Sequence, residues 1–482
     1  MTDWEHNEYR QQRLANLREL EALGYPAYGN AFARTGRLAD VRAAFAEGGR
    51  AALAGRLTTI RNMGKSIFAD LRDGSDRFQI YAHAASLGET PFRAFKFLDV
   101  GDHIGVEGEL FTTRTGEKTL KIERWTLLAK ALLPLPEKWH GLRDVDARYR
   151  QRYLDLIASP EVRERFNRRS RAIAEIRAWL TARGFQEVET PMIQAQAGGA
   201  AAKPFVTHYS ALNTTMYLRI APELYLKRLL VGGFDKVFEL NRNFRNEGLS
   251  RTHNPEFTML EIYEAYANVE SMKTLVQDLI AHVAQTVFGT LQAGAGERAV
   301  NLAPPWREVA YRDLIREKMG ADWFDLPPAE AAQRATAAGV AVDPQWNPLL
   351  LTHEIYEKLV EKTLIQPTFV RRFPAALIPL ARTCPDDPTA ADVFELVIGG
   401  QEIAPAYTEL NDPIEQRRRL AEQAGTELEK VDHDFLLALE HGMPPAGGMG
   451  VGIDRLIMLL CGVEAIRDVI LFPQLKPKDP GE

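Results

Sequence analysis

Cysteine is nearly absent from this chain of 482 residues, which contains only Cys384 and Cys461. Two thiols cannot complete a tetrahedral thiolate zinc site, and they cannot supply the disulfide framework of a small secreted protein. The chain also lacks an uninterrupted apolar run near the roughly 18 residues of a membrane-spanning helix. Its first residues are polar and acidic, unlike a secretory signal. We therefore expect a cytoplasmic protein with no membrane partner.

A strong charge of one sign is missing too. The chain has 59 Lys and Arg against 65 Asp and Glu, a formal net charge of −6, so any surface that binds nucleic acid must be local. One candidate is the stretch Arg143–Arg183, with eleven arginines against six acidic residues. It predicts either a solvated helix face with i,i+4 ion pairs or a surface that contacts RNA or a partner subunit.

The N-terminal part has a helical pattern over residues 3–23 and then five short strand patterns. Turns such as Asp73-Gly74 and Thr115-Gly116 separate the strands. Five short strands within about 80 residues predict a small closed barrel, for which the OB fold is the obvious candidate. The expected strands are Ala51–Ile60, Lys65–Leu71, Arg77–Ala82, His103–Thr113 and Leu120–Leu128.

A proline-rich break at Leu133–Pro136 reads as a linker, so we expect one domain over residues 1–140 and another over 141–482. In the second, helical and strand patterns alternate irregularly, which predicts an α+β domain built on an antiparallel sheet with flanking helices. The expected elements are the helix Pro160–Arg183, the strands Phe185–Thr190, Met216–Ile220, Lys236–Arg242, Met259–Ala265 and Val393–Ile398, and the helix Ile453–Leu460 after the glycine-rich segment 447–452.

The densest chemical signal is the segment Arg242–Gly248 followed by Arg251–Phe257. Two strands joined by a polar loop bring together arginines, a histidine, glutamates and phenylalanines. Guanidinium groups bind phosphate oxygens in pairs, and an aromatic face can take a base, so this hairpin can clamp a nucleoside triphosphate. The alternative is a solvated basic hairpin.

This hairpin is the second of three motifs that stand in a recognisable order. The first is the helix leading into Gly184–Pro191, and the third is Gly450–Leu456. With them the chain resembles the class II aminoacyl-tRNA synthetases, and among these the lysyl enzymes with an N-terminal anticodon-binding OB domain. The resemblance covers nearly the whole chain. It implies a homodimer formed through the first motif, Phe185–Pro191 and the preceding helix.

For ATP, the resemblance implies that Arg245 holds the α-phosphate together with the amino-acid carboxylate. Phe257 would stack on adenine, and Arg455 would face the γ-phosphate and the base. A structural alternative for Arg455 is a buried ion pair with Asp454. The implied ATP-binding set is Arg245, Glu247, His253, Phe257 and Arg455, with Arg245 and Arg455 as the catalytic residues.

Glu395 and Glu402 are seven residues apart with Gly399-Gly400 between them. On one plain strand this odd spacing would place them on opposite faces, but a glycine turn can bring them together. The resemblance implies that they hold Mg²⁺ on the ATP, and oxygen ligands suit that cation. The alternative is a pair of surface glutamates.

The resemblance assigns Glu223 to the α-ammonium group of a lysine substrate and Gly199 to a glycine-rich substrate loop. Glu261, Tyr263 and Glu409 would surround the ε-ammonium group. A desolvated ammonium group is costly unless carboxylates compensate it, and Glu261 and Tyr263 are two apart on a strand and so share a face. The implied lysine-binding set is Gly199, Glu223, Arg245, Glu261, Tyr263, Tyr407 and Glu409.

Three positions depart from the family pattern. Ile378 stands where a small polar residue is usual, and Ala376 where many bacterial members have glutamate. Pro405 occupies the position of an asparagine that contacts the substrate amino acid in the family. Because proline has neither a side-chain hydrogen-bonding group nor a backbone N–H, we expect weaker or altered handling of the lysine carboxylate.

In the barrel, the resemblance implies that Phe68 and Gln79 read an anticodon base, by stacking and through the amide group. Arg61 is a candidate phosphate contact. An aromatic residue on a barrel strand can equally belong to the core, and the sequence without the resemblance favours that alternative.

Together these features predict ATP-dependent activation of L-lysine to lysyl-adenylate, with Mg²⁺, and transfer of lysine to the 3′ end of tRNA(Lys). One alternative is a paralogue that attaches lysine or β-lysine to a protein such as a translation factor, although such relatives lack the barrel domain. The other is a non-catalytic RNA-binding protein on the same scaffold.

Overall fold

The computed structural model describes residues 7–136, 144–196, 198–200, 202–294, 296–425 and 431–477. The chain divides into two compact bodies, residues 1–143 with 153–158 and residues 144–152 with 159–482. The boundary that the sequence predicts between residues 140 and 141 lies outside the described residues. Over the described ranges, we find no helix whose length and apolar character would suffice for crossing a bilayer.

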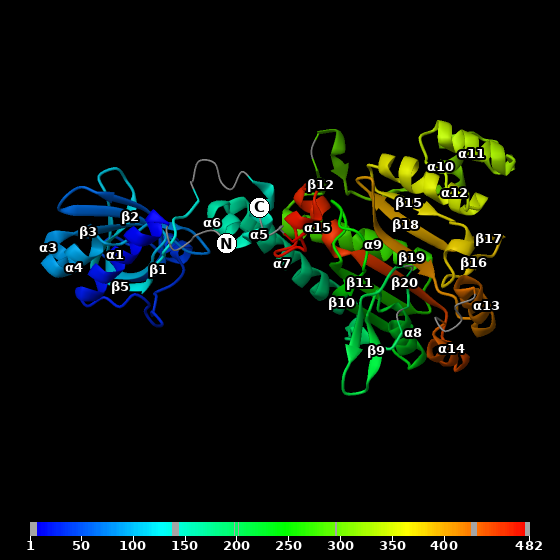
Figure 1. Ribbon diagram of the computed structural model, residues 1–482, viewed down its shortest axis with the longest axis horizontal. Coiled ribbons are helices and arrows are strands. Elements are labelled where there is room, and N and C mark those ends of the chain that lie inside the picture. Colours follow the sequence, from blue (N-terminus) through cyan, green and yellow to red (C-terminus); the bar gives the residue numbers. More distant parts are fainter. Residues whose placement is uncertain are drawn as a thin grey trace. The chain divides into compact units, whose positions relative to one another are not determined.

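The first body contains a closed barrel with the strand order β1-β2-β3-β5-β4 (Figure 1). The five predicted strands are all present, and their ends differ from the prediction by two residues at most. Its elements are α1 (Glu8–Ala22), α2 (Leu38–Ala43), β1 (Arg50–Asn62), β2 (Ser66–Arg72), β3 (Arg77–His83), α3 (Ala84–Leu87), α4 (Glu89–Phe95), β4 (His103–Thr112) and β5 (Lys118–Ala129).

The barrel is filled by alternate residues of its strands. On β2, Ile67, Ala69 and Leu71 point inward and are buried in the core cluster, so Phe68 between them lies on the outer face. The interpretation of Phe68 as a core residue is therefore wrong. This strand alternation leaves a row of half-exposed side chains available for a ligand.

The second body contains a large sheet, several helices and three small sheets. Its strands are β6 (Gln186–Glu187), β7 (Ile193–Gln194), β8 (Val206–Tyr209), β9 (Thr214–Leu218), β10 (Lys236–Phe244), β11 (Glu256–Ala265), β12 (Gln292–Ala293), β13 (Val300–Asn301), β14 (Arg307–Ala310), β15 (Thr368–Arg371), β16 (Thr383–Cys384), β17 (Asp387–Ala391), β18 (Val393–Ile398), β19 (Gln401–Thr408) and β20 (Ala446–Gly452).

The helices that follow the barrel in sequence differ widely in length. They are α5 (Val145–Arg150), α6 (Arg152–Ala158), α7 (Pro160–Thr181), α8 (Glu223–Val231), α9 (Val269–Val283), α10 (Tyr311–Met319), α11 (Pro328–Ala337), α12 (Pro348–Ile355), α13 (Pro413–Ala424), α14 (His433–Glu440) and α15 (Ile453–Cys461). Short 3₁₀ or π turns occupy Ala284–Phe288, Gly296–Arg298, Trp323–Asp325, Tyr356–Val360, Glu361–Thr363, Ala375–Leu377 and Ile466–Asp468.

The large sheet has the order β14-β15-β18-β19-β20-β11-β10-β6. Its central pairs are antiparallel, as the sequence predicted, while the edge pairs β14–β15 and β10–β6 are parallel. The glycine-rich segment before α15 was not expected as a strand, yet it forms β20 in the middle of the sheet. The fold class is α+β, as predicted.

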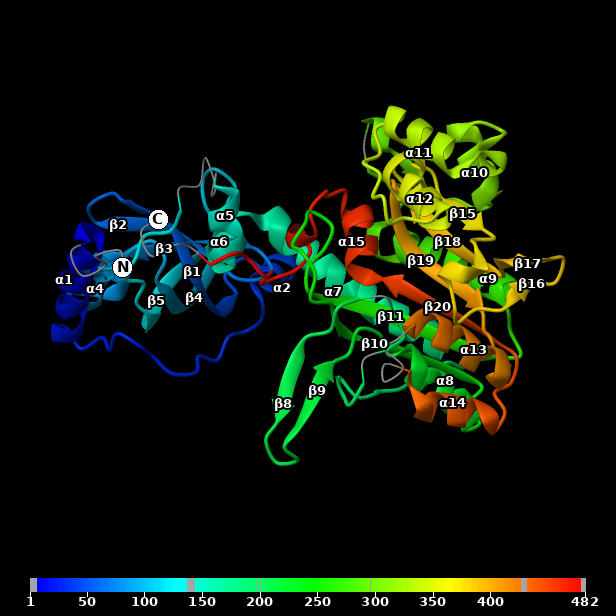
Figure 2. The ribbon, with the colours of Figure 1, turned by 45° about the vertical axis from the view of Figure 1, so that its right-hand side comes forward.

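One face of this sheet is packed against α7, α9 and α15 and forms the main core. On the opposite face, α8 and α14 cover the β10–β11 end, and α10 and α12 cover the β15–β18 end (Figures 1 and 2). The middle strands therefore present a stretch of that face between two groups of helices. This is where the candidate site lies.

The first motif forms the predicted long helix α7. Gly184, which follows the helix, has a left-handed backbone conformation with φ of +81°. The strand expected over Phe185–Thr190 is much shorter, because only β6 pairs with β10. Figure 2 shows the hairpin β8–β9 as an arm that extends from the second body.

The arginine-rich stretch, apart from Arg143 outside the described residues, contains several structural side chains. Arg152 is fully buried and donates to the carbonyl oxygens of Leu471 and Arg467. On α7, Arg168 pairs with Glu164 at 3.2 Å in the i,i+4 pattern. These contacts account for part of the arginine content without any ligand.

Candidate active site

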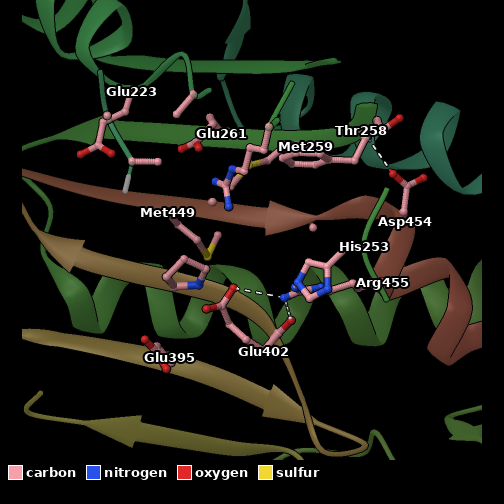
Figure 3. Close-up of a pocket in the computed structure, with 18 of the residues that line it drawn as sticks. Glu223, His253, Thr258, Met259, Glu261, Glu395, Glu402, Met449, Asp454 and Arg455 are labelled. Carbon is pink, nitrogen blue, oxygen red and sulfur yellow. Dashed lines mark hydrogen bonds and ion pairs between the residues drawn. The ribbon is translucent and has the colours of Figure 1, made fainter. Parts of the chain in front are cut away.

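A cavity of about 330 Å³ lies over β11, β20, β19 and β18. Figure 3 shows Glu223 and Glu261 toward one end of it and His253 and Arg455 toward the other. The predicted site residues that line it are Gly199, Glu223, Arg245, Glu247, His253, Phe257, Glu261, Tyr263, Glu395, Glu402, Tyr407 and Arg455. The structure thus gathers residues that are up to 256 positions apart in the sequence, from Gly199 to Arg455.

The second motif is a hairpin of β10 and β11, in register from Lys236 opposite Glu264 to Phe244 opposite Glu256. Arg245 continues the ladder, because its N–H donates to the carbonyl of Pro255 at 2.9 Å. Its guanidinium group lies over the Phe257 ring, 5.2 Å from the centroid. This stacking holds a permanent cation against the floor of the cavity.

Two glycines of β20 make room for the acidic end of the site. A Cβ atom at Gly448 would lie 2.0 Å from Glu409 Oε1 and 2.4 Å from Tyr263 Cε1. A Cβ at Gly450 would lie 2.4 Å from Met259 Cε and 3.2 Å from Glu261 Oε1. The bare backbone of β20 therefore leaves the space in which these side chains approach the cavity.

Glu261 is buried beside Tyr263, whose hydroxyl donates to Glu261 Oε2 at 3.2 Å. Burial raises the pKa of the Glu261 carboxyl well above its ordinary value, the nearby Glu223 raises it further, and Arg245 opposes the rise. A carboxylate in this environment lacks a counter-charge. A cationic ligand would supply one.

Glu409 is fully buried and lies directly behind Gly448, and it is not among the residues that line the cavity. Its carboxylate pairs with Lys227, which the sequence analysis did not single out. Lys227 Nζ lies 2.5 Å from Glu409 Oε2 and 2.7 Å from Glu223 Oε1. The i,i+4 spacing of Glu223 and Lys227 on α8 was a sequence signal for that second pair.

Glu395 and Glu402 both line the cavity, on the neighbouring strands β18 and β19, which are joined by a turn at Gly399-Gly400 (Figure 3). A β-bulge brings this about. Leu396 is opposite Ala404 but Val397 is opposite Glu402, so Ile403 is the extra residue. If Ile403 paired as a regular strand residue, with no bulge, the period of two would turn Glu402 toward the α9 core.

Arg455, on the first turn of α15, faces Glu402 and His253. Its Nη1 donates to the Glu402 carbonyl at 2.9 Å, and its Nη2 lies 3.0 Å from His253 Nε2. Burial lowers the pKa of His253, and Arg455 lowers it further, so the imidazole is neutral at pH 7. Asp454 instead pairs with Arg169 at 2.6 Å, so the alternative of an Arg455–Asp454 ion pair is wrong.

The three departures from the family pattern fall in different places. Ile378 and Pro405 line the cavity, and Pro405 lies opposite Glu395 just beyond the β19–β20 ladder. Ala376 is exposed and lines a separate cavity near α10 and α12. The lining also includes His353, Phe373 and Leu377, which the sequence did not single out.

On the barrel, Phe68 and Gln79 lie on the outer face of β2 and β3, and Arg61 is exposed on β1 opposite Phe68. The Gln79 amide oxygen accepts a hydrogen bond from Thr119 at 2.9 Å. Tyr81, which the sequence analysis missed, packs on Phe68 with ring centroids 4.7 Å apart. Its position two residues from Gln79 on the same strand was the available signal.

The chain matches two family models. Residues 144–476 match the model described as tRNA synthetases class II (D, K and N), and residues 51–128 match the OB-fold nucleic acid binding domain. A closed barrel followed by a sheet that carries an arginine-rich hairpin and a glycine-rich third motif is the architecture of a class II aminoacyl-tRNA synthetase.

Curated relatives are similar over nearly the whole chain. The lysine–tRNA ligases of Moorella thermoacetica and Carboxydothermus hydrogenoformans are both 48% identical to it, over 98% and 99% of this chain and 99% and 100% of their own. That of Syntrophomonas wolfei is 49% identical over 98% of both chains. The chain belongs to the lysine–tRNA ligase family of class II synthetases.

Proposed function

We propose that this protein activates L-lysine with ATP and transfers it to tRNA(Lys). The observation that carries the proposal is the charge pattern of one cavity. Its acidic end, with Glu223 and Glu261, suits the ammonium groups of lysine, and Arg245 and Arg455 suit the phosphates of ATP. A pocket for an acidic amino acid would need the opposite sign.

In the first step, a lysine carboxylate oxygen attacks the α-phosphorus of ATP. A phosphorus–oxygen bond forms to the carboxylate, the bond to the β-phosphate breaks, and lysyl-adenylate and pyrophosphate result. Charge develops on the phosphoryl oxygens, and Arg245, held over Phe257, would stabilise it. No side chain acts as a nucleophile, so catalysis is positioning and charge stabilisation.

Arg455 and its neighbours would hold the far end of ATP. The neutral imidazole of His253 accepts from Arg455, which fixes the guanidinium group at the cavity. Phe257 offers an aromatic face for adenine, and Glu247 lines the same side of the cavity. These roles for Glu247, His253, Phe257 and Arg455 are part of the proposal.

Mg²⁺ fits the pair Glu395 and Glu402. Burial raises the pKa of Glu395 well above its ordinary value, and the nearby Glu402 and Glu361 raise it further, so this corner favours an added cation. Within the described ranges no cluster of three or more acidic, histidine or cysteine side chains forms a metal cage. Two carboxylates together with ATP phosphates are the ligation that Mg²⁺ prefers, and it would neutralise phosphate charge.

In the second step, the terminal ribose 3′-hydroxyl of tRNA attacks the adenylate carbonyl carbon. An ester bond forms, and AMP leaves. We assign residues 1–140 as the anticodon-binding domain and 141–482 as the catalytic domain. Phe68 would stack on a base, Gln79 would bind its edge, and Arg61 would contact a phosphate.

We also propose a homodimer formed through α7 and the Phe185–Pro191 segment. After that segment in the sequence, the small sheet β7-β9-β8 and the turn between β8 and β9 expose large apolar side chains, with Ile193 54%, Val206 64% and Leu212 66% accessible. Such a patch typically marks a protein interface. Light scattering after gel filtration should give twice the chain mass of 54.1 kDa.

The two free cysteines agree with the cytoplasm as its compartment.

The test of function is pyrophosphate exchange and tRNA aminoacylation with each of the twenty amino acids in turn. We expect exchange that depends on lysine and Mg²⁺, and charging of tRNA(Lys). Exchange without tRNA charging would favour the alternative of a protein acceptor. Absence of exchange with every amino acid would favour a non-catalytic RNA-binding protein and overturn the proposal.

A further inference from the structure

Lys227 is a buried cation at the acidic end of the cavity, and the steps above give it no role. Its side chain is fully buried, in the second turn of α8. Its ammonium nitrogen lies 2.7 Å from Glu223 Oε1 and 2.5 Å from Glu409 Oε2. These two carboxylates come from different elements, α8 and the residue after β19, and Lys227 joins them.

The two carboxylates stand in different relations to the cavity. Glu223 lines it directly, whereas only the bare backbone of Gly448 separates Glu409 from it. Both carboxylate oxygens of Glu409 are buried without a well-oriented hydrogen bond to a described residue; Oε2 is held by the ion pair with Lys227, and the one without a charged partner is Oε1. This oxygen is therefore available for a donor on the cavity side, while Oε2 faces Lys227.

We propose that Lys227 is a positioning residue for the amino-acid substrate, which favours the ionised forms of Glu223 and Glu409 and fixes their separation for the two ammonium groups of lysine. The inference rests on the proposed function, because it assumes that Glu223 receives the α-ammonium group and Glu409 the ε-ammonium group. Lys227 touches neither the carboxylate that reacts nor the phosphates. It acts through the two glutamates.

A count of charges supports this role. Glu223, Glu261 and Glu409 carry three negative charges and Lys227 one positive charge, so the ionised empty site has a net charge of −2. The two ammonium groups of lysine bring this sum to zero, and its carboxylate is left to pair with Arg245, which lies outside the count. An amino acid with an apolar side chain brings one, and a buried charge would stay unpaired.

The direction of the pKa shifts agrees with the geometry. Burial alone would lower the pKa of Lys227, but Glu223 and Glu409 outweigh it, so the ammonium group stays charged. Burial raises the pKa of Glu409, and Lys227 works against that rise. Without Lys227, the empty site would hold a further proton on one of the two glutamates, and lysine would have to displace it.

Other titratable groups face this cluster from the surrounding elements. On β11 they are Glu261 and Tyr263, and on β19 Tyr407, which itself is close to Glu395 and Glu402. Arg245, beyond β10, opposes the rise in the Glu261 pKa. All of these are present in every variant considered below, so a difference between variants reports on Lys227.

The experiment measures the lysine KM in pyrophosphate exchange from about pH 6.5 to about pH 8.5 for the wild type, Lys227→Met and Lys227→Arg. Each proton that lysine must displace adds about a tenfold rise in KM per pH unit on acidification. We expect Lys227→Met to be steeper than the wild type by up to one such tenfold step. The kcat at saturating lysine should stay within about threefold of the wild type.

Two controls separate this role from a structural one. Lys227→Arg keeps a permanent charge and should restore the wild-type slope. Lys236→Met removes another lysine of the same body, which pairs with Glu264 at 2.7 Å and is partly exposed, and should leave the slope unchanged. Loss of thermal stability with an unchanged slope in Lys227→Met would overturn the inference.

A charge-balanced variant keeps the test decisive if Lys227→Met does not fold. Lys227→Met/Glu409→Gln removes one charge of each sign, so the net buried charge stays at −2, and its slope should not exceed that of the wild type. A steeper slope would overturn the inference. The proposed function fails separately, if the wild type shows no lysine-dependent exchange. The pH slopes of the Lys227 variants test only the inference about Lys227.

Discussion

The acidic end of the catalytic cavity and the outer face of the barrel are both candidate recognition surfaces, but they differ in how their side chains are held. At the cavity, Glu261 in its lining and Glu409 behind Gly448 are buried carboxylates that depend on counter-charges. On the barrel, Phe68 and Tyr81 are half-exposed rings that pack on each other. A buried charge that loses its partner costs much free energy, so the cavity should tolerate few substitutions or other ligands. Stacking contributes a moderate free energy of binding and accepts several bases.

The largest effect should come from Glu261→Gln. Removing one partner of a buried ion pair costs about 3–5 kcal/mol, so kcat/KM for lysine should fall by roughly 100- to 1,000-fold or more. The matched control is Glu264→Gln on the same strand, whose carboxylate pairs with the partly exposed Lys236. Equal losses in the two variants would contradict the charge-based account of the cavity.

Gly448→Ala should come next. The new Cβ would approach Glu409 Oε1 and Tyr263, so the strand or these side chains must shift, at a cost of about 1–3 kcal/mol. We expect the lysine KM to rise by roughly 10- to 100-fold, measured by pyrophosphate exchange. Gly452→Ala on the same strand is the control, because its nearest atom lies 3.7 Å away. A Gly448→Ala enzyme with wild-type KM would show that Glu409 does not reach the substrate.

Phe68→Ala tests the other side of the comparison. Loss of one stacked base costs about 1–3 kcal/mol, so the tRNA KM in aminoacylation should rise about 5- to 100-fold. Lysine-dependent exchange without tRNA should stay unchanged. Met63→Ala, a more exposed residue beside the β1–β2 turn, serves as the control. A loss of exchange activity in Phe68→Ala would mean that the variant acts through folding and not through stacking.

The pH dependence of lysine binding sharpens the contrast, since the barrel face has no comparable buried acid in the proposed contact set. Burial raises the pKa of Glu409 to about 8, with Lys227 opposing the rise. The ammonium group of lysine favours the ionised form, so affinity is full above that pH and falls as the pH drops through it. We expect the wild-type lysine KM to rise up to about tenfold per pH unit below about 8, with a tRNA KM that changes less.

The smallest effect should be that of Pro405→Asn. An asparagine opposite Glu395 would regain an amide group that can donate to the lysine carboxylate. We expect the lysine KM to fall by a few fold, measured at saturating ATP. An unchanged or higher KM would count against a role for Pro405 in weakening the handling of the substrate.

Regular alternation made much of this molecule predictable. Period-two patterns located the barrel strands, and the spacing of Glu261 and Tyr263 placed both on one face of β11. The strand β20 could not be predicted from its composition, because glycine has low strand propensity. It forms a strand here because it pairs with β11 and β19, and glycine suits it because neighbouring side chains fill the space that Cβ atoms would take.

Contacts between distant segments were also beyond the sequence. Nothing in the chain places Lys227 beside Glu409, since that pair depends on how α8 packs over the end of β19. Similarly, the partner of Asp454 proved to be Arg169 on α7 and not the adjacent Arg455. Charged side chains pair with whichever partner the fold brings within reach, and neighbours in sequence have no advantage on a helix unless they are three or four residues apart.

The extra residue at Ile403 sets which face the side chains of β19 present near the β18–β19 turn. Deleting a single amino acid there would keep the composition of both strands almost intact. If Ile403 were the residue removed, Glu402 would still pair with Val397 and stay on the cavity face, whereas a strand that kept every residue but lost the bulge would turn Glu402 toward the α9 core.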